Sequence, residues 1–114
     1  MSFYESYQQT VFFHPPELSA PGVTDTYETY VINYLSTRNY TMLVKVADVN
    51  DKVVVRLEGS NDGVNFGAML SETINEDGTY AYNSTGFPVK FVRGNFYKEF
   101  GGTDAKVKFE ISAN

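Results

Sequence analysis

Two Asp-Gly dipeptides, Asp62-Gly63 and Asp77-Gly78, constrain the fold of this chain more than any other feature. Both lie between apolar runs, within residues 57–82, which read LEGSNDGVNFGAMLSETINEDGTYAY. Asp-Gly supplies the positive φ angles that tight turns between antiparallel strands need. The stretch therefore predicts strand, turn, strand, turn and strand. We assign a structural turn role to Asn61, Asp62, Gly63, Asp77 and Gly78.

Apolar and polar residues alternate along most of the remaining sequence. In the clearest example, Val107, Phe109 and Ile111 alternate with charged and polar residues. A period of two places one face of a strand on a core and the other in water. On this basis Val55 and Leu57 are also predicted to be buried. Strands are predicted at residues 30–35, 42–47, 53–58, 67–73, 79–82, 90–96 and 106–112.

Several short strands separated by turn-forming residues are typical of an antiparallel β-sandwich or a jelly-roll-like fold. The chain has 114 residues, which suits one all-β domain with one core. We place this domain at residues 23–114. No helix or repeat is predicted.

Residues 1–22 differ from the rest and are predicted to form an extended N-terminal arm. Aromatic rings stand among Ser, Gln and Thr, and His14-Pro15-Pro16 favours an extended chain. A strand at residues 10–13 is compatible with two arrangements, an edge strand of its own domain or an arm that reaches a neighbouring subunit. The residues that would make such an interface are Phe3, Tyr4, Tyr7, Phe12 and Phe13.

Composition limits the partners. The net charge is −5, which disfavours binding to the phosphate backbone of nucleic acids. No stretch approaches the roughly 20 apolar residues of a membrane span. The sequence MSFYESYQQT has no signal-peptide pattern, so we expect synthesis in a cytoplasm. The absence of cysteine removes disulfides and thiolate metal sites.

We assign no catalytic, metal or cofactor-binding residue, and expect no enzymatic activity and no cofactor. His14 is the single histidine, which argues against a His-based triad or metal centre. Calcium ligation by turn oxygens and a glycosidase-like carboxylate pair are weaker alternatives to plain turn chemistry. The residues concerned are Asn61, Asp62, Asn65, Glu76 and Asp77 for calcium, and Glu58, Asp62 and Glu72 for the pair.

Flat rings can also stack on sugars, so the aromatic residues allow a carbohydrate platform as an alternative to core or interface packing. The rings concerned are Tyr80, Tyr82, Phe96, Tyr97 and Phe100.

The segment Ser60 to Phe66 resembles the S-x-D-G-x-x-[WF] hairpin of small β-sandwich virion proteins of tailed bacteriophages. The resemblance spans residues 40–112. The other pieces that match are Val53 to Leu57, Gly78-Thr79-Tyr80, Phe91-Val92-Arg93, Gly101 to Ala105 and Lys106 to Ile111.

This resemblance implies a non-enzymatic virion structural protein that decorates or cements the outer capsid surface. Its partners would be the major capsid protein or another virion protein, with further copies of itself as a homo-oligomer on the particle. Neither nucleic acid nor membrane is implied. The alternatives are a carbohydrate- or receptor-binding module of a fibre, or a neck, tail or baseplate component.

Overall fold

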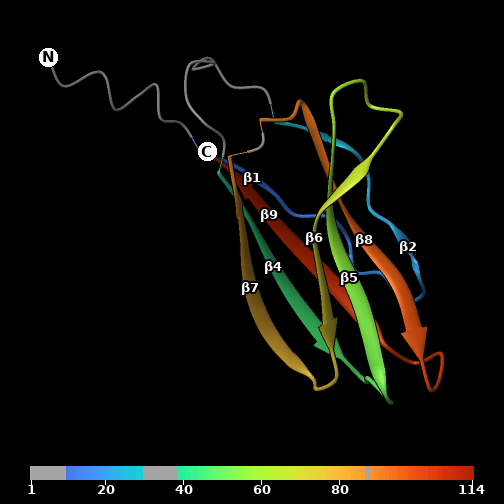
Figure 1. Cartoon of the computed structure of the whole chain (residues 1–114). Coiled ribbons are helices and arrows are strands. Elements are labelled where there is room, and N and C mark those ends of the chain that lie inside the picture. Colours follow the sequence, from blue (N-terminus) through green and yellow to red (C-terminus); the bar gives the residue numbers. More distant parts are fainter. Residues whose placement is uncertain (1–9, 30–38, 87) are drawn as a thin grey trace, which may run out of the picture.

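The protein forms two antiparallel sheets packed face to face, as seen in a computed structural model that describes residues 10–29, 39–86 and 88–114 (Figure 1). All regular structure in this part of the chain is β, and it contains no helix that could cross a membrane. The strands are β1 (Val11–Phe13), β2 (Gly22–Val23), β3 (Tyr27–Glu28), β4 (Asn39–Ala47), β5 (Lys52–Ser60), β6 (Gly67–Ile74), β7 (Gly78–Thr85), β8 (Phe91–Phe100) and β9 (Lys106–Ala113).

The strand order is that of a jelly roll. Sheet A has the order β1-β9-β4-β7, and sheet B has the order β2-β8-β5-β6, with β3 also paired to β8. The pairs nest around the middle of the chain: β5 with β6, β4 with β7, β2 and β3 with β8, and β1 with β9. This nesting is the double Greek-key connectivity of jelly rolls. The predicted β-sandwich is confirmed.

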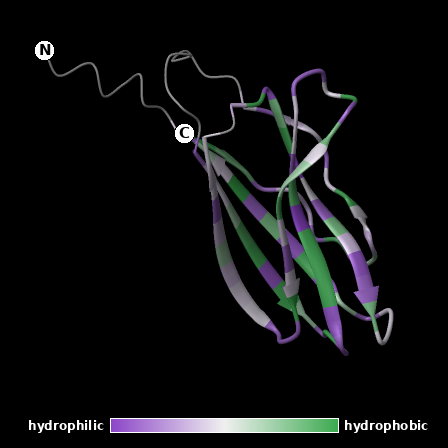
Figure 2. Cartoon of the chain, in the orientation of Figure 1, coloured by the Kyte–Doolittle hydropathy of each residue, from purple (hydrophilic) through white to green (hydrophobic). Residues whose placement is uncertain are grey.

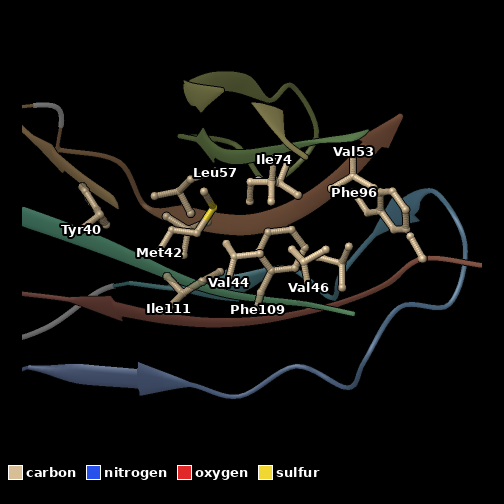
Figure 3. Packing of buried hydrophobic residues seen from close by; sticks show 14 of the residues in the cluster. Tyr40, Met42, Val44, Val46, Val53, Leu57, Ile74, Phe96, Phe109 and Ile111 are labelled. Atoms are coloured by element: carbon tan, nitrogen blue, oxygen red, sulfur yellow. The ribbon is translucent and has the colours of Figure 1, made fainter. Parts of the chain in front are cut away.

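The core lies between the sheets and is filled by the inward faces of the long strands (Figure 3). Val55, Leu57 and Phe109 are fully buried, as predicted. The charged neighbours Lys106 and Lys108 are exposed. Figure 2 shows the same alternation as successive hydrophobic and hydrophilic bands along β5 and β9. The period of two thus identified the inward faces of these strands correctly.

A close contact joins the centres of the two sheets. Gly94, on β8 of sheet B, lies against the ring of Phe109, on β9 of sheet A. A Cβ atom on Gly94 would lie 2.6 Å from the Phe109 ring. Only glycine therefore leaves room for the ring at this depth of the core.

The second Asp-Gly turn differs from the predicted tight turn between two paired antiparallel strands. β6 belongs to sheet B and β7 to sheet A, so the turn at residues 75–77 crosses between sheets instead of closing a hairpin. Asp77 anchors this crossing, because its carboxylate accepts the backbone N–H groups of Asp48 and Val49 at 3.1 and 3.0 Å. The strand that follows is also longer than predicted.

The predicted boundary between the N-terminal arm and the β-domain, between residues 22 and 23, falls inside β2. The residues on both sides of this boundary contact the sandwich. β1 pairs with β9, and Leu18 exchanges backbone hydrogen bonds with Val107. Phe13 stacks on Tyr27, with ring centroids 4.8 Å apart. Residues 11–23 therefore pack on the β-domain, with β1 and β2 as its edge strands. The predicted strand at 30–35 and the first nine residues lie outside the described part of the chain.

Replacing Phe109 with Ala should destabilise the protein by about 3–5 kcal/mol, because the ring is fully buried and its loss leaves a cavity. Chemical denaturation would measure the change. Lys108→Ala, on the outer face of the same strand, is the control and should change stability by no more than about 0.5 kcal/mol. Equal effects of the two variants would contradict the assignment of faces.

Gly63→Ala should destabilise the protein by about 1–2 kcal/mol, because Gly63 has a φ of 77°. The cost should come from the backbone, since the nearest atom to an added Cβ is 3.5 Å away. Gly67→Ala is the matched control at the other end of the same loop, where an added Cβ meets nothing within 4 Å. Thermal melting should separate the two variants, and coincident curves would refute the turn assignment.

Candidate functional site

The β5–β6 loop is organised by the carboxylate of Asp62. Its Oδ1 atom accepts the backbone N–H groups of Val64 and Asn65, both at 2.8 Å, and the Ser60 hydroxyl at 2.9 Å. Its Oδ2 atom accepts the side-chain amide of Asn65 at 2.7 Å. Ser60 Oγ in turn accepts the N–H of Gly63 at 2.9 Å. These bonds hold the pKa of Asp62 well below its usual range, chiefly through the backbone N–H groups of Asn65 and Val64.

The residues considered for calcium do not form one site. Asn61, Asp62 and Asn65 lie in the β5–β6 loop, whereas Glu76 and Asp77 lie at the opposite end of β6 (Figure 1). In the described ranges, no three His, Cys, Asp or Glu side chains gather in a way that could hold a metal ion. The oxygens of Asp62 and Asp77 are hydrogen-bonded within the protein.

Two of the carboxylates considered as a catalytic pair, Glu58 and Asp62, are also held in separate hydrogen-bond networks. Glu58 is 7% exposed and accepts Arg93 Nε at 2.8 Å and Asn95 Nδ2 at 2.9 Å. Sequence reasoning missed this network. The signal that could have found it is a Glu directly after the Val-rich strand Val53 to Leu57, because a carboxylate buried in a sheet needs partners.

Rings and cations alternate on the outer face of sheet B. The pairs are Arg56 over Tyr97 at 3.5 Å, Arg93 over Phe66 at 3.9 Å, and Lys52 and Lys98 over Phe100 at 4.9 and 5.0 Å. Such cation–π contacts occupy the ring faces that a sugar would need. Of the rings named for a carbohydrate platform, Phe96 is fully buried, and Tyr80 and Tyr82 pack against the core.

A shallow apolar groove of about 210 Å³ lies on the outer face of sheet A. It is lined by residues of β1, β4 and β9, among them Leu43 and Ile111. Phe12, which pairs with Ser112, is 65% exposed at its border. His14 Nδ1 lies 3.1 Å from Glu110 Oε1 on the same border.

The five residues predicted to form an interface therefore separate into three groups. Phe12 is exposed and lies at the groove. Phe13 packs inward against the core of its own chain. Phe3, Tyr4 and Tyr7 lie outside the described residues.

No protein-family model and no curated protein matches this chain. Among solved structures, the SPBc2 prophage-derived protein YomS matches with a TM-score of 0.60 at 9% identity, over 93% of this chain and 94% of that one. A structure of Bacillus endospore appendages that form disulfide-linked pili matches with a TM-score of 0.44 at 12% identity, over 92% of this chain and 82% of that one. The similarity to YomS is one of fold, and it extends over almost the whole of both chains.

The Asp62 network should make stability depend on pH in a way that an Asp62→Asn variant loses. The pKa of Asp62 is lower in the folded protein than its value of about 3.9 in an unfolded chain, so its contribution is full above that value and fades as the pH falls below it. The difference in unfolding free energy between wild type and variant should be constant from pH 7 to about 5 and then shrink. Urea denaturation at pH 7, 5 and 3 would measure it, and a constant difference would contradict the network.

Proposed function

We propose that this chain is a non-enzymatic virion structural protein that decorates the outer surface of a phage capsid through protein–protein contacts. The observation that carries the proposal is the fold shared with a prophage-derived protein over nearly the full length of both chains. The S-x-D-G-x-x-[WF] hairpin supports the same assignment, and its Asp62 and Gly63 are structural in this fold.

The contact surface in this proposal is the outer face of sheet A around Phe12. An exposed ring beside an apolar groove can be buried by a partner without rearrangement of the core. The chain entering this strand from the N-terminal side is rich in aromatic residues, which would extend the contact. The partner is the major capsid protein or another exposed virion protein.

Immunogold electron microscopy of phage particles from cells that encode this chain tests the proposal. Antibodies raised against the purified protein should label the capsid shell, and quantitative mass spectrometry should give a fixed ratio of this chain to the shell protein. Label confined to the neck, tail or baseplate, or to fibre tips, would favour one of the alternatives. Particles without the chain would overturn the proposal.

Phe12→Ser should weaken binding to capsids by about 1.5–3 kcal/mol, which is roughly a 10- to 150-fold change, because the ring loses its burial on binding. Stability should change by no more than about 0.5 kcal/mol, since the ring is mostly exposed in the free protein. Val64→Ser is the control, because Val64 is 79% exposed in the distant β5–β6 loop. Co-sedimentation with purified particles measures both, and equal binding by the two variants would place the contact elsewhere.

A further inference from the structure

In the part of the chain that the structure describes, β7 is an open edge of sheet A. It pairs with β4 through eight consecutive residues, from Gly78 opposite Val46 to Thr85 opposite Asn39, without a bulge. Beyond this ladder, residues 78–85 make no backbone–backbone hydrogen bond to any other described residue. The outward N–H and C=O groups of such a strand are a ready template for another strand.

The other edges of the sandwich carry features that oppose strand addition. β1 has three residues and runs into His14-Pro15-Pro16, and β2 and β3 have two residues each. β6 has a register shift against β5 and carries Glu72. Short strands, prolines, bulges and charges are the usual protections of sheet edges. β7, with the sequence GTYAYNST, has no charged residue, no proline and no bulge.

We infer that β7 pairs antiparallel with β7 of a second copy of this chain, so that the two A sheets join into one continuous eight-stranded sheet. The pairing is centred on Ala81, which faces Ala81 of the partner subunit. Tyr80 then lies opposite Tyr82 of the partner subunit, and Thr79 lies opposite Asn83 of the partner subunit. The interface is isologous and closes at two copies.

The charges of the chain favour this edge over other surfaces for self-association. Two copies with a net charge of −5 repel each other, and β7 itself brings no charged side chain to the pairing. The charge that faces this strand from a neighbouring element is Glu72 of β6, which acts on Tyr82. The sheet also continues without a break, because the β4–β7 register is regular up to the edge.

The side chains of β7 suit the same register. Tyr80 and Tyr82 are half-buried and pack against the core, so their remaining surface lies at the sandwich edge. Aromatic pairs across antiparallel strands stabilise a sheet. Ala81 is exposed on the outer face and is small enough to sit at the twofold axis, where it faces its own copy.

This inference concerns a second copy of the chain and stands whether or not the protein belongs to a capsid. Sedimentation equilibrium of the purified full-length protein tests it. The wild type should show twice the monomer mass of 12.8 kDa. Ala81→Lys should weaken dimerisation at least tenfold, because it places two like charges opposite each other, while leaving the melting temperature of the monomer unchanged.

Two further measurements make the result specific. Thr73→Lys adds the same charge at an exposed position of the other long edge strand, β6, and should leave the dimer intact. Ala81→Lys mixed with Ala81→Glu should restore a 1:1 heterodimer through an opposite-charge pair. A monomeric wild type, a dimer that Ala81→Lys does not weaken, or a mixture that fails to associate would each overturn the inference.

Discussion

The contact between Phe109 and Gly94 sets the geometry on which the rest of the sandwich depends. Phe109 lies on β9 opposite Val44 of sheet A, and Gly94 lies on β8 opposite Leu57 of sheet B. A ring seated on a residue without a side chain brings the central strands of the two sheets together. The faces that point outward, and hence every surface available to a partner, follow from this arrangement.

The sequence predicted the local features well because they depend on neighbouring residues. Alternation identified the buried faces of β5 and β9, and Asp62-Gly63 identified a turn with positive φ. The crossing from β6 to β7 was not predictable, because an Asp-Gly dipeptide specifies the shape of a turn but not the sheet that the next strand joins. The hydrogen bonds that Asp48 and Val49 donate to Asp77 help to fix this crossing, and they join residues nearly thirty positions apart in the chain.

The direction in which the aromatic side chains face was equally hard to predict from the sequence. A ring in a strand can face the core, a cation or water, and the sequence pattern does not distinguish these. Tyr97 follows the buried Phe96 and faces outward, where Arg56 covers its ring. The β5–β8 register shifts at this point, between Val54 and Val55, which gives β8 one extra residue. Phe12 and Phe13 are adjacent, yet one is exposed and the other stacks on Tyr27. Alternation alone would separate these two, but it could not say which one faces the core.

The two proposed contacts lie on the same sheet and do not compete. Sheet A has β1 at one edge and β7 at the other, with β9 and β4 between them. In an antiparallel pairing of two β7 strands, residues at equivalent positions face the same side, so the outer faces of the two A sheets would form one surface. Each copy would then present Phe12 near an outer end of that surface. Two binding rings on one rigid face could engage two neighbouring sites of a regular shell at once, which raises the effective affinity without any new contact in either subunit. Self-association through an uncharged edge would in this way turn a small apolar patch into a bivalent one.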